Sequence, residues 1–422
     1  MNTSKKALLA GITGTALQWY DFALFGYFAS IIATTYFPNE NETVSLLSSF
    51  CVFAVGYLLS PLGSLLFGYI GDKFGRKRAL TLSILAMAIP TALMSLVPSY
   101  HSIGIAAPIL IVGLRIVQGL VASSEFTGSA VFLVEHAKPG KKAFYGCLTS
   151  SAYSLGTLLA GLAATLLTAS FMPAWGWRIG FALALVAGII IFYLRLNVSE
   201  TPEYQHLSAQ KQLPFPFLKA LKNSPHALIG VLGVSWLIGV LTYGTYVFTG
   251  TYLHHYFGLS LSQATLIITF ALLVDALFEP LMGIWADKIG FLRIIQYGMV
   301  AIILLSLPIF YLITTGIIWC ITLGLVLMSG LIAITCAPLN AYLVSLFPPE
   351  YRCSAFSTAF NTGITLFGST APLVMLWLVD KTGNVNAPAW YYMTSALIGL
   401  ASLALCEYSQ SRLTQTKAIV AY

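Results

Sequence analysis

The chain contains very few charged residues for its length. Only 8% of its 422 residues are Asp, Glu, Lys or Arg, whereas soluble globular domains carry about 25%. So few charges cannot cover the surface of a protein of this size and keep it dispersed in water. A soluble enzyme, a nucleic-acid-binding protein and a secreted disulfide scaffold are therefore all disfavoured.

Motifs for metals, disulfides and nucleotides are also missing from the sequence. The six cysteines are scattered through apolar runs without CxxC spacing, so we expect small buried hydrophobic residues and neither a disulfide framework nor a metal site. The GxxxxGK[ST] motif is absent, which argues against ATP as the energy source. We expect no cofactor. No cluster of nucleophilic, metal-binding or phosphate-binding residues suggests a membrane-embedded enzyme.

Most of the chain consists instead of long apolar runs. Hydrophobic residues make up 58% of the sequence and its mean hydropathy is +0.84. Because a helix needs about 20 mostly apolar residues to cross a bilayer, these runs predict twelve membrane spans, near 8–37, 44–70, 79–97, 104–135, 143–168, 175–196, 225–256, 261–286, 291–313, 317–346, 353–379 and 387–407. The first run lacks a cleavage site of small residues, so we expect a membrane helix and no removed signal peptide.

One long hydrophilic stretch divides these spans into six and six. We therefore expect an all-α membrane protein with an N-terminal six-helix bundle (1–196), a cytoplasmic linker (197–224) and a C-terminal six-helix bundle (225–422).

The basic residues predict the orientation of the chain. With the N-terminus in the cytoplasm, all but three of the 21 Lys and Arg residues fall on the cytoplasmic side; Arg115 lies within a span, and Arg178 and Lys381 lie outside. Such a bias sets orientation by the positive-inside rule. It predicts a multi-pass protein of the cell membrane, a bacterial inner membrane, with both termini cytoplasmic. It also explains the net charge of +7 without a nucleic acid partner.

Two loops of the first half are echoed in the second half. FGYIGDKFGRKR follows span two and MGIWADKIGFLR follows span eight, with their glycines and charges aligned at a constant offset of 215 residues. A second echo links 132–142 with 342–352. Parallel halves related by an axis along the membrane normal are typical of one large class of transporters. Chance similarity of cytoplasmic loops is the alternative.

The loop after span two resembles the signature between spans two and three of the major facilitator superfamily. Its glycines permit a tight connection between helices, and its charges can form contacts at the cytoplasmic mouth that break when the two halves rock. The resemblance implies gating roles for Gly68, Gly71, Asp72, Gly75, Arg76, Lys77 and Arg78, and for Asp287 and Lys288 in the second half.

Further motifs resemble the metabolite:H+ symporter family, which includes proline/betaine, α-ketoglutarate, citrate and shikimate carriers. They are GTALQWYDFALFGYFA in span one, RIVQGLVASSEFTGSAVFLVEHA in span four, and WGWRIGFAL and SETPEY around span six. The resemblance implies the major facilitator fold, two pseudo-symmetric bundles that alternate access to a site between them. The chain departs from that family at Gln18, where members usually carry glutamate, and at Ser60, where they usually carry arginine. These changes prevent the transfer of any member's substrate.

Five ionisable residues fall inside predicted spans, where their energetic cost makes them functional candidates: Asp21, Arg115, Glu125, Asp275 and Glu279. From the helical rise, Asp21 lies about 20 Å along span one and Arg115 about 16 Å along span four, so both are near the bilayer middle. We expect an ion pair in which protonation of Asp21 frees Arg115, or in which an anionic substrate competes for Arg115. A static pair that only fixes helix packing is the alternative.

The remaining acids are weaker candidates for proton coupling. Glu125 is expected to serve the inner gate or relay a proton, with a structural role equally open. Asp275 and Glu279 lie one turn apart on one face of span eight. Two carboxylates this close in a low dielectric cannot both ionise cheaply, so we expect one to hold a proton. Asp275 is the coupling candidate, and Glu279 could instead join a gate network with Asp287 and Arg293.

Aromatic and polar side chains supply the candidates for cargo contacts. Trp19, Tyr20, Arg115 and Asn361 are expected to touch the substrate, although aromatic residues are also common in membrane proteins as interfacial belts. The Gly- and Thr-rich stretch around Tyr243 is expected to bend during transport. Four acids against one base in the membrane interior suit a cation, a zwitterion or a neutral metabolite better than a dianion.

The sequence thus predicts a proton-coupled secondary importer of an amino acid, a betaine-like osmolyte or an organic acid. Its energy source would be the proton gradient, and its partners the cargo, H+ and the lipid bilayer, with no obligatory protein partner. An exporter of a drug-like or siderophore-like compound, sharing the same fold, is the alternative.

Overall fold

The computed structural model describes residues 3–40, 42–208 and 214–420, and these ranges are helical almost throughout, without a strand. Helices are expected because apolar hydrocarbon offers no partner for backbone N–H and C=O groups, which a helix pairs internally. Within the described ranges ten helices are long and apolar enough to cross a membrane: Arg76–Leu96, Ala106–Glu135, Lys142–Leu167, Trp177–Leu196, Pro225–Phe257, Leu261–Ile289, Phe291–Ile313, Ile318–Ser345, Arg352–Thr382 and Ala387–Ser411.

The two remaining predicted spans are each built from two consecutive helices. Span 8–37 consists of α1 (Thr3–Tyr27) and α2 (Ala29–Tyr36), and span 44–70 consists of α3 (Glu42–Leu58) and α4 (Ser60–Phe74). A single residue separates the helices in each pair. Together with the ten long helices, these pairs complete the twelve spans expected from the sequence.

The chain divides into two compact units. Unit 1 comprises residues 1–136 and 152–212, and unit 2 comprises residues 137–151 and 213–422. One long helix, α8 (Lys142–Leu167), contributes its first residues to unit 2 and the rest to unit 1. Of the predicted linker, residues 209–213 lie outside the described part of the chain.

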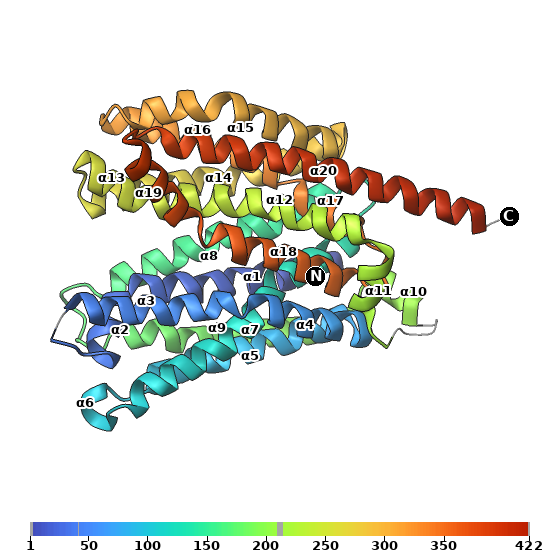
Figure 1. The fold of residues 1–422 in the computed structure, drawn as a ribbon. Helices are drawn as coiled ribbons and strands as arrows, with labels where there is room; N and C mark the ends of the chain where they lie inside the picture. The colour runs from blue at the N-terminus through green and yellow to red at the C-terminus, as the bar shows by residue number, and fades with distance from the viewer. Residues whose placement is uncertain (1–2, 41, 209–213, 421–422) are drawn as a thin grey trace. The chain divides into compact units, whose positions relative to one another are not determined.

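Unit 1 is built around aromatic and aliphatic packing between its long helices. Besides α1 to α4 and part of α8 it contains α5 (Arg76–Leu96), α6 (Tyr100–Ile103), α7 (Ala106–Glu135), α9 (Trp177–Leu196) and α10 (Pro202–Ser208). The most extensive contacts join α5 to α7 and α9, and α1 packs against α7 and α9 (Figure 1). Phe25, Phe28, Trp177 and Phe181 are buried at the centre of one of its cores. This packing holds the end of α1 against α7 and α9.

Unit 2 contains helices interrupted by two short π-helical turns. Its elements are α11 (Pro216–Asn223), α12 (Pro225–Tyr243), η1 (Gly244–Phe248), α13 (Thr249–Phe257), α14 (Leu261–Ile289), α15 (Phe291–Ile313), α16 (Ile318–Cys336), α17 (Leu339–Ser345), α18 (Arg352–Gly363), η2 (Ile364–Gly368), α19 (Ala371–Thr382) and α20 (Ala387–Val420). In Figure 1, α12 lies beside α18 and α20, which it contacts extensively.

The two π-helical turns interrupt predicted spans seven and eleven. Such turns are rare and frequently occur at functional sites. Next to η2 the backbones approach so closely that a Cβ on Gly239 would lie 2.5 Å from the Cα of Gly368. The first turn begins directly after Tyr243, in the stretch that the sequence predicts to bend.

The repeated loop glycines have nearly the same backbone conformation in both units. Gly75, between α4 and α5, has φ 110° and ψ 149°, and Gly290, between α14 and α15, has φ 111° and ψ 136°. Residues other than glycine rarely adopt these backbone angles. Each glycine ends one helix and begins the next, so the repeat in the sequence corresponds to a repeat in the backbone.

Candidate functional site

Asp21 and Arg115, the pair expected from their depths in the membrane, face each other inside unit 1. Arg115 Nη1 on α7 lies 3.5 Å from Asp21 Oδ2 on α1. Both side chains are excluded from solvent, at 1% and 0% exposure. In so dry a setting each charge depends on the other, because an isolated buried charge is very costly.

Neighbouring polar groups complete this pair. Gln118, one turn further along α7, accepts a hydrogen bond from Arg115 Nη1 at 3.1 Å and donates from Nε2 to Asp21 Oδ1 at 3.4 Å. The same amide nitrogen donates to Thr91 Oγ1 on α5 at 2.7 Å. The Arg115 guanidinium also lies 3.7 Å from the centroid of the Phe25 ring, a cation–π contact. The network joins three helices, and nothing in the sequence pointed to the role of Thr91.

The two aromatic residues beside Asp21, Trp19 and Tyr20, make different contacts. Tyr20 donates its hydroxyl to the carbonyl oxygen of Gly180 on α9 at 3.0 Å, and its contact with the cargo stays a prediction. Trp19 lies edge-on to Tyr153, with ring centroids 4.4 Å apart. Within the described ranges, the buried Nε1 of Trp19 and Oε1 of Gln18 have no hydrogen-bond partner. Both atoms therefore retain a hydrogen-bonding capacity that water or cargo can satisfy.

A second buried ion pair in unit 1 joins Glu125 to Arg195. Arg195, in the last turn of α9, donates from Nη1 to Glu125 Oε2 at 3.1 Å and from Nη2 to Oε1. Its Nε and Nη2 each donate to the carbonyl oxygen of Ala10 at 3.1 Å, and Ser83 donates to Glu125 Oε2 at 2.5 Å. The sequence-based count of interior charges omitted Arg195, which it placed at the cytoplasmic end of span six.

A glycine on α1 makes room for this second pair. A Cβ on Gly14 would lie 1.9 Å from Arg195 Nη2 and 2.2 Å from Glu125 Oε1. A side chain at this point of α1 would displace the guanidinium or the carboxylate from its position, so a glycine here suits the ion pair between α7 and α9.

Unit 2 holds two of the three carboxylates of α14 in its interior. Asp275 and Glu279 are each 2% exposed. Ser151, on the part of α8 that belongs to unit 2, donates its hydroxyl to Glu279 Oε2 at 3.2 Å. Among the described residues no ion pair involves Glu279. The predicted cargo contact Asn361 donates to Ser357 O, one turn earlier on α18, at 2.9 Å.

Among the predicted gate residues of unit 1, Arg76 contacts Asp72 and Gly71. The Arg76 side chain is 1% exposed, and its Nε lies 3.3 Å from Glu135 Oε2 at the end of α7. Its Nη1 lies 3.7 Å from Asp72 Oδ1 and donates to the carbonyl oxygen of Gly71 at 3.0 Å. Gly68 and Gly71 are buried along α4. Sequence reasoning missed Glu135 as a partner, although this residue lies in the motif of span four.

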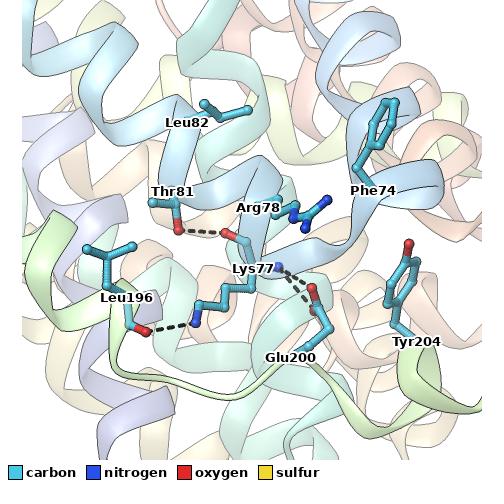
Figure 2. A pocket seen from close by; sticks show the side chains of 8 residues that line it. All are labelled: Phe74, Lys77, Arg78, Thr81, Leu82, Leu196, Glu200 and Tyr204. Atoms are coloured by element: carbon cyan, nitrogen blue, oxygen red, sulfur yellow. Dashed lines mark hydrogen bonds between the residues drawn. The ribbon is translucent and has the colours of Figure 1, made fainter. Parts of the chain in front are cut away.

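The first turn of α5 is capped by a residue from the segment after α9. Glu200 accepts hydrogen bonds from the backbone nitrogen of Lys77 through both carboxylate oxygens, at 3.1 Å each. Lys77 Nζ donates to the carbonyl oxygen of Leu196 at 2.8 Å, as Figure 2 shows. Tyr204 donates its hydroxyl to Lys73 O at 2.8 Å, and burial raises the pKa of this phenol, which keeps it protonated as a donor. The motif SETPEY thus fixes the turn between α4 and α5.

Asp287, the acid of unit 2 that aligns with Asp72 in the repeat, caps the start of α8. Asp287, near the end of α14, accepts hydrogen bonds from the backbone nitrogens of Ala143 at 2.8 Å and Phe144 at 2.9 Å, in the first turn of α8. A carboxylate at this place satisfies free N–H groups and complements the helix dipole. The neighbouring Lys288 is exposed. A gate role of Asp287 would therefore act through α8.

Comparisons with known proteins agree with this architecture. The family model described as Major Facilitator Superfamily matches residues 11–372 and 252–414. The glycine betaine/proline/ectoine/pipecolic acid transporter OusA of Dickeya dadantii is 34% identical over 411 residues, covering 94% of this chain and 82% of that protein. The proline/betaine transporter of Escherichia coli K12 is 32% identical over 414 residues, with the same coverage.

Solved structures show the same fold. The proton:xylose symporter XylE aligns with a TM-score of 0.75 at 18% identity, covering 96% of both chains. The human organic anion transporter MFSD10 aligns with a TM-score of 0.74 at 17% identity, covering 96% of this chain and all of the other. These matches confirm what the loop and span motifs predicted: the chain belongs to the Major Facilitator Superfamily, and it is a multi-pass membrane transporter and not an enzyme.

Proposed function

We propose that this transporter imports a zwitterionic osmolyte of the proline or betaine kind together with protons. The observation that carries the proposal is the charge balance inside unit 1, where Asp21 is paired with Arg115 and Glu125 with Arg195. A dianion would find both of these arginines already matched by a carboxylate. A zwitterion brings both charges with it and can exchange with a pair without leaving a net buried charge. The names of the curated relatives support the same class of cargo.

Proton coupling follows from the chemistry of the Asp21–Arg115 pair. A proton on Asp21 neutralises the carboxylate and leaves the guanidinium available for the carboxylate of the cargo. Loss of the proton restores the pair, and the cargo carboxylate is then displaced. Trp19 Nε1 and Gln18 Oε1, beside Asp21 on α1, supply the polar contacts that orient the cargo. This is a two-state exchange in which protonation and cargo binding favour the same state.

Unit 2 contributes two buried carboxylates on one face of α14. Asp275 is the second coupling residue in this proposal, with Glu279 one turn away, and the carboxylates hold either a proton or the cationic group of the cargo. Asn361 supplies a further polar contact to the cargo.

The proposed transport cycle alternates access by movements of two bundles, 1–196 and 225–422, joined by a cytoplasmic linker, 197–224. The repeated loops, Gly68 to Arg78 and Asp287 to Lys288, form and break the gate. In this proposal both termini lie on the cytoplasmic side of a bacterial inner membrane, because most of the basic residues fall on that side.

Purified protein in liposomes loaded with a pH-sensitive dye tests the proposal. Proline, glycine betaine, a cationic amino acid, a monocarboxylate and citrate are added one at a time outside. We expect proline or glycine betaine to acidify the lumen and citrate to leave the pH unchanged. Acidification by citrate alone would refute the proposal that the cargo is a zwitterion. Proton movement in the opposite direction, or none with any of these solutes, would favour export of a larger compound.

A further inference from the structure

A hollow of about 700 Å³ lies beside the turn between α4 and α5 in unit 1. It is formed by the first turns of α5, the end of α9 and the segment that leads into α10 (Figure 2). The residues that line it are Phe74, Lys77, Arg78, Thr81, Leu82, Leu196, Glu200 and Tyr204. The transport chemistry of Asp21 and Arg115 makes no use of this hollow.

The hollow lies where an apolar span gives way to charge. The apolar helix α5 begins at Arg76, and Lys77 and Arg78 follow directly. Leu82, one turn further into the span, is 52% exposed, and Leu196 at the end of α9 is 46% exposed. In a membrane, basic side chains at the end of an apolar span lie at the level of the lipid headgroups, while exposed leucines on the span itself face acyl chains.

The residues in and beside the hollow carry a net positive charge. Both oxygens of Glu200 are already engaged by the Lys77 backbone nitrogen, and Oε1 also accepts from Thr201 N at 2.9 Å. Lys73 Nζ lies 5.5 Å from the centroid of the Phe74 ring, which adds a positive charge at the rim. The charges of Lys73, Lys77 and Arg78 therefore exceed the single charge of Glu200.

Arg78 is the basic group that is left available. Its guanidinium forms no hydrogen bond or ion pair with another residue in 3–40, 42–208 or 214–420, and Figure 2 shows it extending on the side of Phe74 and Tyr204. The planar guanidinium matches two oxygens of a phosphate group.

We propose that this hollow binds the headgroup of an anionic phospholipid. Arg78 and Lys77 contact the phosphate diester, and the acyl chains run along Leu82 and Leu196. A free phosphate ion has the same headgroup chemistry but no use for the apolar wall, so the leucines favour the lipid. Basic pockets beside membrane helices are general binding places for such headgroups.

Native mass spectrometry of the purified, detergent-solubilised protein tests this site. The protein is titrated with phosphatidylglycerol and, in parallel, with phosphatidylcholine of the same chain length, and bound lipid is counted. We expect phosphatidylglycerol to bind more tightly. Arg78→Gln should weaken phosphatidylglycerol binding about fivefold, the effect of removing one basic contact, and leave phosphatidylcholine unchanged. Arg78→Lys should retain most of the preference because it keeps the charge.

The second repeat supplies a matched control. Arg293 follows Gly290 as Arg78 follows Gly75, at the same offset of 215 residues, and it is also exposed. Arg293→Gln should leave phosphatidylglycerol binding unchanged. Equal losses in Arg78→Gln and Arg293→Gln would mean general surface attraction and would overturn the site. Full binding by Arg78→Gln would overturn it too, as would displacement of the lipid by equimolar inorganic phosphate, which would indicate a soluble anion instead.

Discussion

Arg195 on α9 and Glu125 on α7 form a two-pronged ion pair inside unit 1, although 70 residues separate them in the sequence. Arg195 also donates to backbone carbonyls on α1, at Ala10, and on α5, at Leu80. A single guanidinium on α9 thus contacts three other helices, α1, α5 and α7, at one level of the unit. Because the pair is buried, removing one partner leaves the other charge in a low dielectric without compensation.

Glu125→Gln is therefore expected to destabilise the protein strongly. The loss should be about 3–5 kcal/mol, the usual cost of leaving one member of a buried pair. Unfolding in mixed micelles with increasing denaturing detergent measures it. The double variant Glu125→Leu, Arg195→Met should be more stable than Glu125→Gln, since no charge is left unpaired.

An exposed ion pair of the same chain provides the control. Lys219 and Glu350 are paired in unit 2, but their side chains are 37% and 39% exposed. Glu350→Gln should change stability by only about 0–1 kcal/mol, because water screens the pair. Equal effects of Glu125→Gln and Glu350→Gln would contradict the buried role of the first pair.

Gly14→Ala should reproduce the damage without removing a charge. Its new methyl group would lie 1.9 Å from Arg195 Nη2, so the guanidinium must leave its position. Gly26, on the same helix, has no atom within 4 Å of the place that an alanine methyl group would take, and so tolerates alanine. We expect a lower thermal unfolding midpoint for Gly14→Ala and an unchanged or higher midpoint for Gly26→Ala. The same midpoint for both variants would show that the ion pair can shift to make room for the methyl group without a loss of stability.

Asp21→Asn should separate proton coupling from cargo binding. The amide cannot lose a proton, so it mimics the protonated state, in which Arg115 is available to the cargo. We expect proton-driven accumulation in liposomes to disappear, while exchange of labelled cargo for unlabelled cargo across the membrane persists. Accumulation at the wild-type level under the same pH gradient would remove Asp21 from the mechanism.

The two loop glycines should differ in their tolerance of alanine. The backbone angles of Gly75 and Gly290 impose a strain of about 1–3 kcal/mol on any L-residue. At Gly75 the new Cβ would in addition lie 2.2 Å from Glu200 Oε2, whereas at Gly290 no neighbouring atom of the described residues lies within 4 Å of the new Cβ. Gly75→Ala should therefore be the less stable variant in thermal unfolding. A larger loss for Gly290→Ala would mean that the contact with Glu200 carries little weight.

Asp287→Ala should loosen the start of α8. It removes the acceptor for the backbone nitrogens of Ala143 and Phe144, a loss of about 0.5–2 kcal/mol by analogy with helix caps. Amide hydrogen exchange of residues 142–146 should rise specifically. Asp380→Ala serves as control, because Asp380 is exposed and, among the described residues, accepts only from the Tyr256 hydroxyl. Exchange at the start of α8 that equals the wild type would exclude Asp287 as its cap.

Several elements of the site could be predicted from residues alone. Asp21 and Arg115 were found because a charge within an apolar run is conspicuous, and because helical rise converts sequence position into depth. The turn at Gly75 and its repeat at Gly290 could be predicted from the sequence, because a backbone conformation with positive φ favours glycine in both copies. The acids of α14 were found by the same reasoning as Asp21.

Other elements depended on distances between helices that no single segment encodes. Arg195 stands at the edge of an apolar run, and such an arginine can extend outward to the membrane surface or turn inward toward a carboxylate. Only the position of α7 against α9 decides in favour of Glu125. In the same way, Glu200 and Glu135 belong to recognisable motifs, but the sequence does not say which backbone or side chain each one meets.

The sequence by itself determined that this chain spans a membrane with two related halves, because the cost of burying charge and backbone in hydrocarbon leaves a long apolar run few alternatives to a helix. It also determined which charges had to be explained. Tertiary structure decided which charge neutralises which, since a buried ion pair forms only where packing brings two side chains within a few ångströms. It also explains why α1 has a glycine at position 14. The space that a side chain would take there is occupied by Glu125 of α7 and Arg195 of α9.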